Sequence, residues 1–287
     1  LRPGRYRVYV KAIDEARNER IEEKEVEIEN IPGVEHTLST TGKTNNNVDI
    51  TFTNKGNLIL QVKENGVWVN KTSPYSVDKN KKVIVRYTDG YNVGSEKEIE
   101  ITNIDKVLPV ISASISNTTE YSKEVSVTLN ATDNVEVKSF EYGVSNSSTV
   151  KPTLSKVNGP VVINNKTGKY YIHTKAEDKV GNIKEEVYGP YLLDNEAPEV
   201  LVKLDGTTSN KIKLKVEATD TEAGIKGYYY SKDGGNTYSH MQTSGIYMYT
   251  RLKNDTEYKI RVKVEDKLGN IAESEIKTIR TAPLGNI

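Results

Sequence analysis

One repeated stretch of the sequence limits what the chain can fold into. In residues 258–270, apolar residues at every second position alternate with charged ones, which is the pattern of a half-buried β-strand. The stretch ends in Asp266-Lys-Leu-Gly-Asn270, a turn sequence, because Asp can cap its own backbone and Gly and Asn tolerate positive φ. Related stretches occur at residues 170–182 and 6–18, and a less regular one at residues 81–93. A chain that repeats one hairpin in this way is predicted to be an array of small β-domains.

The spacing of these turns predicts the size of each domain. The turn aspartates Asp14, Asp89, Asp178 and Asp266 recur at intervals of roughly 75–90 residues, which suits one Ig-like sandwich per interval. We therefore expect an all-β chain of tandem sandwiches, with further domains of the same chain at both ends. The expected divisions are residues 1–30 as the last hairpin of an incomplete domain, residues 31–105, 106–194 and 195–282 as three sandwiches, and residues 283–287 as the start of a following unit or a tail.

Short linkers join the predicted sandwiches. Residues 103–109 and 193–198 end at Pro109 and Pro198, and proline restricts φ and removes a backbone donor. We therefore expect the linkers to be semi-rigid and the array to form a rod.

Composition argues against several classes of function. The 287 residues carry 40 Lys and Arg against 40 Asp and Glu, so there is no general attraction to nucleic acid or to an anionic membrane. The absence of cysteine excludes disulfides, thiolate metal sites and cysteine catalysis. No apolar run reaches the ~18 residues of a membrane span, and no nucleophile elbow, phosphate loop or convergent carboxylate pair is present. We expect no nucleic-acid partner, no membrane insertion and no enzymatic activity.

Two motifs carry a family resemblance. Residues 252–264, with Leu252, Thr256 and Tyr258 at their key positions, resemble the Leu-x-Pro-x-Thr-x-Tyr-x-x-x-Val-x-Ala pattern of fibronectin type III modules, although Asn254 replaces the proline. The Ala-x-Asp-x-x-Gly-Asn ending of residues 176–182 resembles the bacterial Ig-like repeats of surface proteins. The resemblance implies tandem fibronectin III-like or Ig-like sandwiches.

The same resemblance implies a structural part for three tyrosines. Tyr6, Tyr170 and Tyr258 would each place the ring in the core and the hydroxyl on a nearby backbone group, as in a tyrosine corner. Residues 31–105 depart from the pattern, because Lys81 stands where the other copies carry tyrosine.

Acidic residues at the turns and linkers are the candidate metal ligands. Asp178, with the linker residues Asp194 and Glu196, loosely resembles the calcium-binding elements of cadherin linkers. Calcium takes about six to eight oxygen ligands, which these carboxylates do not supply, and the Asp-Arg-Glu element of cadherins does not occur. We therefore expect no cofactor, with calcium as the only candidate.

Aromatic residues and one histidine give further expectations. Exposed tyrosines of the last predicted sandwich could stack on sugars or anchor a protein partner. The candidates are Tyr229, Tyr238, Tyr247 and Tyr249. Trp68 is predicted to fill the core of its sandwich, and His173, on the charged face of its strand, is predicted to face solvent.

These patterns favour a non-catalytic stalk or spacer of a bacterial surface protein, located outside the cell. One alternative is an adhesin or a module that binds a protein or glycan through the tyrosines of the last sandwich. Another is a structural component of a phage virion or of an extracellular filament.

Overall fold

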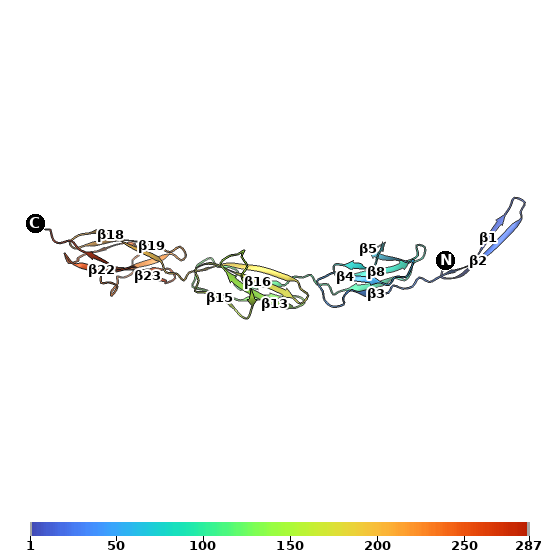
Figure 1. Ribbon diagram of the computed structural model, residues 1–287, viewed down its shortest axis with the longest axis horizontal. Helices are drawn as coiled ribbons and strands as arrows, with labels where there is room; N and C mark the ends of the chain where they lie inside the picture. The colour runs from blue at the N-terminus through green and yellow to red at the C-terminus, as the bar shows by residue number, and fades with distance from the viewer. Residues whose placement is uncertain (1, 286–287) are drawn as a thin grey trace. The chain divides into compact units, whose positions relative to one another are not determined.

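The computed structural model describes residues 2–285, and all its regular elements in that range are β-strands (Figure 1). The chain divides into two compact units, residues up to 108 with 179–182, and residues 109–178 with those from 183 onward. Within residues 2–285, no helix has the length and apolar character needed to cross a membrane.

The first unit contains a hairpin and one β-sandwich. Strands β1 (Gly4–Ile13) and β2 (Glu19–Ile28) form the hairpin, which is paired over the full length of both strands. In what we call the first sandwich, one sheet has the order β3-β4-β7 and the other β6-β5-β8-β9. The strands are β3 (His36–Leu38), β4 (Val48–Phe52), β5 (Ile59–Glu64), β6 (Val67–Lys71), β7 (Tyr75–Val77), β8 (Lys81–Thr88) and β9 (Lys97–Ile101).

The second unit begins with the second sandwich. Its larger sheet has the order β14-β13-β16-β17, and the short pairs β10-β12 and β11-β15 form the opposite side. The strands are β10 (Val110–Ala113), β11 (Glu124–Val127), β12 (Leu129–Thr132), β13 (Val137–Ser145), β14 (Ser155–Lys156), β15 (Val161–Asn164), β16 (Gly168–Asp178) and β17 (Ile183–Leu193).

The third sandwich completes the second unit. One sheet has the order β18-β19-β21, and in the other β22 pairs with β20 and with both β23 and β24. The strands are β18 (Glu199–Thr207), β19 (Ile212–Thr219), β20 (Ile225–Ser231), β21 (Ile246–Tyr249), β22 (Glu257–Asp266), β23 (Ile271–Glu273) and β24 (Lys277–Arg280). The chain is thus built of tandem β-sandwiches of the Ig-like, fibronectin III-like kind.

Each sandwich has its own hydrophobic core, filled from both of its sides. In β22, Ile260, Val262 and Val264 are fully buried, whereas Arg261 and Lys263 on the opposite face reach solvent. Burying a side chain of this kind contributes about 1.5–3 kcal/mol. The alternation seen in the sequence is therefore the source of both the sheet face and the core.

In the copies at residues 258–270 and 6–18, the turn is closed by its aspartate. Asp266 Oδ1 accepts the backbone N–H groups of Leu268 and Asn270, each at 2.8 Å, and Gly269 adopts a φ of 83°. The Asn270 side chain donates to Asp266 Oδ2 at 2.7 Å. Asp14 accepts the corresponding two bonds from Asn18 at 2.8 and 2.9 Å, so the predicted turn is confirmed in both copies.

Two of the three expected tyrosine corners have their backbone hydrogen bond. The Tyr258 hydroxyl accepts the backbone N–H of Lys253 at 2.8 Å, and the Tyr6 hydroxyl donates to the Arg2 carbonyl at 2.6 Å. The Tyr258 ring packs against the core of its sandwich, but the Tyr6 ring lies in the hairpin and belongs to none of the three cores, which corrects that part of the expectation. The Tyr170 ring packs against the core of the second sandwich and under Lys166 Nζ, but its hydroxyl has no hydrogen bond within residues 2–285.

The structure corrects two expectations about buried residues. Trp68 lies on the solvent-facing side of its sheet, because it pairs with Lys63 rather than with the inward-facing residues of β5. His173 is buried, with 4% of its surface exposed, and its Nε2 lies 2.8 Å from the carbonyl oxygen of Ser147. Strand parity correctly places His173 on the outer face, but the loop after β13 covers that face.

We expect Tyr258→Phe to lower the free energy of unfolding of the third sandwich by about 1–2 kcal/mol, because the Lys253 N–H loses its partner. Tyr249→Phe is the matched control, since that buried hydroxyl has no hydrogen bond in the described part of the chain. Its removal should leave stability unchanged or raise it slightly. Calorimetry of the whole chain measures the free energy of unfolding of both variants. Equal decreases in the two variants would contradict the assignment of Tyr258 as a tyrosine corner.

The hairpin of residues 1–30 should exchange its amide hydrogens quickly. A two-stranded hairpin is marginal in water, and Val8 and Val10 of β1 are 45% and 64% exposed, whereas the matching residues of β22 are buried. Hydrogen exchange should therefore be much faster in β1 than in β22. Protection of β1 at the level of β22 would show that the hairpin belongs to the first sandwich and that the division near residue 31 is misplaced.

Candidate functional site

Three aspartates of the second unit form the candidate cation centre. Asp194 directly follows β17, Asp220 directly follows β19, and Asp266 is the last residue of β22. One carboxylate oxygen from each lies within 4.8 Å of the other two, and Asp194 and Asp266 are fully buried. Three strand ends thus bring three carboxylates together where only Asp220 has access to solvent.

Backbone N–H groups hold these carboxylates in place. Asp194 accepts the N–H of Glu196 on Oδ1 and that of Ala223 on Oδ2, each at 3.2 Å. Asp220 Oδ1 accepts the N–H of Gly224 at 2.6 Å. Burial raises the pKa of Asp194, and the negative charges of Asp220 and Asp266 raise it further.

The sequence predicted only part of this group. Asp194 belongs to it, but Glu196 contributes only its backbone N–H, and Asp178, at the end of β16, is not a member. Asp220 was missed. The available signal was the earlier repeat, where Asp105, Asp133 and Asp178 stand at similar intervals in the sequence.

The arrangement offers one oxygen from each of three carboxylates. A hard divalent cation prefers such ligands, but calcium takes about six to eight oxygens. Five of the six carboxylate oxygens already accept a hydrogen bond from the chain. Our expectation is therefore unchanged: calcium does not control the stability of this linker.

Asp220→Asn should stabilise the third sandwich at neutral pH by about 1–3 kcal/mol, because it removes one of three neighbouring negative charges. Because the pKa of Asp194 is raised in the folded state, the folded wild type binds a proton there at a higher pH than the unfolded chain does. The wild type therefore regains stability as the pH falls from the folded-state pKa toward the lower unfolded-state pKa. The advantage of the variant should therefore shrink on acidification.

Thermal unfolding at pH 7 and at pH 4, each with and without millimolar calcium, measures the effect of Asp220→Asn. Asp205→Asn, which removes an exposed aspartate paired with Lys213, controls for a general effect of charge. A wild-type melting temperature that rises several degrees with calcium, together with destabilisation by Asp220→Asn, would contradict the expectation.

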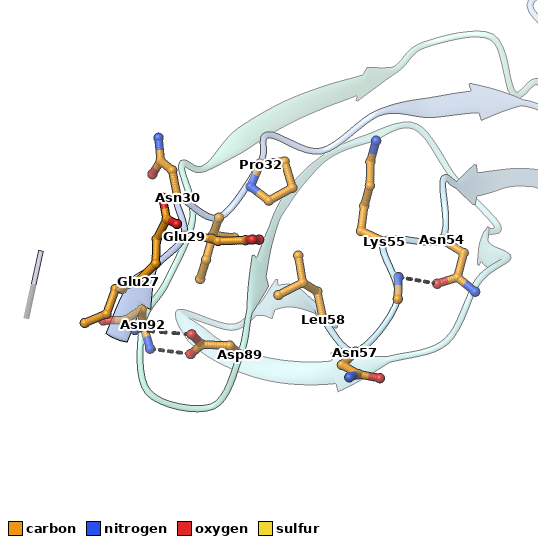
Figure 2. A pocket seen from close by; sticks show the side chains of 13 residues that line it. Glu27, Glu29, Asn30, Pro32, Asn54, Lys55, Asn57, Leu58, Asp89 and Asn92 are labelled. Atoms are coloured by element: carbon orange, nitrogen blue, oxygen red, sulfur yellow. Dashed lines mark hydrogen bonds between the residues drawn. The ribbon is translucent and has the colours of Figure 1, made fainter. Parts of the chain in front are cut away.

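A polar cavity of about 840 Å³ lies in the first unit (Figure 2). It is lined by residues 27–32, which include the end of β2, by residues 54–58, and by the turn residues Asp89 and Asn92. Asp89 accepts hydrogen bonds from the backbone N–H and the side chain of Asn92, as Figure 2 shows, so its carboxylate stabilises the turn. The cavity mixes Glu27 and Glu29 with several asparagines and has no convergent catalytic group among the described residues.

The tyrosine candidates divide between the two faces of the third sandwich. Tyr247 and Tyr249 share the inward parity of β21; Tyr249 is 8% exposed, and Tyr247 stacks on buried Tyr230 with ring centroids 4.1 Å apart. This corrects the expectation that their rings are exposed. Tyr229 and Tyr238 lie on the outer face of the other sheet, where Lys263 Nζ is 4.6 Å from one ring centroid and 4.7 Å from the other.

The similarity of this chain to known proteins is a similarity of fold. No protein-family model matches the chain, and no curated protein sequence matches it. Among solved structures, consecutive domains of titin are 15% identical with a TM-score of 0.34, over 87% of this chain and 98% of that chain. Three fibronectin domains of chicken contactin are 16% identical with a TM-score of 0.26, over 88% and 99%.

A bacterial example is also similar. The fibronectin(III)-like modules of CbhA from Clostridium thermocellum are 16% identical with a TM-score of 0.28, over 63% of this chain and 98% of that chain. At these scores, the fold assignment rests on the sheets and cores of the chain itself.

Proposed function

We propose that this chain is a non-catalytic spacer of a bacterial cell-surface protein, in which tandem sandwiches hold other parts of the protein at a distance. The observation that supports the proposal most directly is the linker at residues 194–198. A linker that is hydrogen-bonded to both of its neighbours transmits position, whereas a free linker does not.

The second sandwich binds the start of this linker. The backbone N–H of Asp194 donates to the Ser122 carbonyl at 3.0 Å. The Asn195 side chain donates to the carbonyls of Lys123 and Lys166, each at 2.9 Å, and its N–H donates to Thr167 Oγ1.

The third sandwich binds the same short segment. The N–H of Ala223 donates to Asp194 Oδ2 at 3.2 Å, and the Asn270 side chain approaches the Asp194 carbonyl at 3.4 Å. Asp194 is therefore hydrogen-bonded to both sandwiches and Asn195 to the second, which supports a semi-rigid joint.

Distances between spin labels test the proposal. The chain has no cysteine, so Ser126→Cys and Lys232→Cys place one label on the second sandwich and one on the third, both at exposed positions. We expect a narrow distance distribution that broadens with Asn195→Ala, because the two side-chain hydrogen bonds to the carbonyls of Lys123 and Lys166 are lost. Asn117→Ala, at an exposed position outside the linker, is the matched control.

A broad distribution in the otherwise unaltered chain would contradict the spacer function, since such a joint would be a flexible tether. The location is tested separately. Antibody labelling of intact cells should detect the chain at the cell surface, and its recovery only in virion or filament fractions would favour the alternative.

A further inference from the structure

Lys263 occupies an unusual position on the outer face of the third sandwich. It lies on β22, the central strand of its sheet, and its ammonium group is placed between the rings of Tyr229 and Tyr238. Within residues 2–285 no carboxylate lies within 4.0 Å of Lys263 Nζ, so its charge is balanced by no direct ion pair. Cation–π contacts stabilise the group but leave its N–H donors able to bind an anion.

The two rings are held in place from both sides. The Tyr229 hydroxyl donates to Glu265 at 2.7 Å, and the same carboxylate pairs with Lys226 at 2.7 Å. The Tyr238 hydroxyl donates to Glu273 at 3.1 Å, and that carboxylate pairs with Arg261 at 2.9 Å. Rings fixed in this way lose little conformational entropy on binding a ligand.

The loop that carries Tyr238 is itself ordered by hydrogen bonds. Asp233 accepts the N–H and the hydroxyl of Thr237 and the hydroxyl of Ser231. Gly235, at a φ of 100°, lets the loop pack closely, since a Cβ there would lie 3.1 Å from the Tyr238 hydroxyl oxygen. The position of Tyr238 is thus built into the loop.

The first sandwich shows what the same position does without this arrangement. Arg86 also stands three residues before its turn aspartate and stacks on one ring, Trp68, at 4.0 Å. Its Nε, however, donates to Gln61 at 2.9 Å, and no second ring flanks it. Of these two sandwiches, the third places a cation beside two aromatic rings, whereas the first has one ring beside its cation.

The charges indicate the ligand. Lys226 and Arg261 are paired with Glu265 and Glu273, and Asp233 lies in the neighbouring loop, so among the described residues of this group Lys263 is the cation without an ion pair; one such cation matches a single carboxylate better than a polyanion. The flanking glutamates can accept hydrogen bonds from hydroxyl groups. Because β22 is paired on both edges, this face offers no free backbone for an added peptide strand.

We infer that this face, formed by Tyr229, Lys263 and Tyr238, binds a glycan that carries a uronic acid. The sugar carboxylate would contact Lys263 between the two rings, and its hydroxyls would reach Glu265 and Glu273. This activity is additional to the spacer function and does not depend on it.

Isothermal titration of the whole chain with trigalacturonate tests the inference. The fully methyl-esterified trisaccharide is the control ligand, because it has the same sugar rings without the charge. We expect the acid form to bind about tenfold more tightly than the ester, the effect of one charge-assisted hydrogen bond. Lys263→Gln should abolish this preference, and Tyr238→Ala should weaken binding of both forms.

Lys215→Gln is the matched variant, on the exposed outer face of the opposite sheet, and should bind as the wild type does. Melting curves establish that each variant is folded. The inference is overturned if the wild type binds neither trisaccharide, binds both equally, or is unaffected by Lys263→Gln. Equal binding of a tetraglutamate peptide would also overturn it, since the site would then recognise acidic peptides.

Discussion

The hydrogen bonds around the turn aspartate are the interaction on which each repeat depends. Asp266 closes the turn between β22 and β23 and so fixes where the central strand of the sheet ends. The register of that strand decides which of its side chains enter the core and which face solvent. The same carboxylate is one of the three that meet at the linker, so the end of a strand, the core and the joint share one residue.

The sequence predicted those features that strand periodicity and local turn chemistry determine. The alternation in residues 258–264 gave the buried and exposed faces of β22 correctly, and the turn motif gave its end. Periodicity assigns a side chain to a face, but it does not say what lies above that face. His173 was placed on the correct face and is nevertheless buried, because a loop from the same sandwich covers it.

The candidate sites were harder to predict, because they depend on contacts between distant parts of the chain. Asp220 joins Asp194 and Asp266 only once three strand ends meet. Tyr247 and Tyr229 look alike in sequence, yet one stacks inside the sandwich and the other holds a lysine on its surface. Most exposed ion pairs on these sheets contribute about 0–1 kcal/mol each to the free energy of unfolding. Stability therefore resides in the cores, and the residues on the outer faces can be changed with little effect on it.

The lengths of the first strands have a mechanical consequence. A pull on the N-terminal end of a sandwich loads its first strand before any other. In the second sandwich that strand, β10, is paired with β12 over four residues, whereas in the third sandwich β18 is paired with β19 along most of its nine. Fewer backbone hydrogen bonds therefore resist the peeling of β10. In the first sandwich the first strand, β3, is paired with β4 over only three residues, so by this measure the first and second sandwiches offer less resistance to such a pull than the third does.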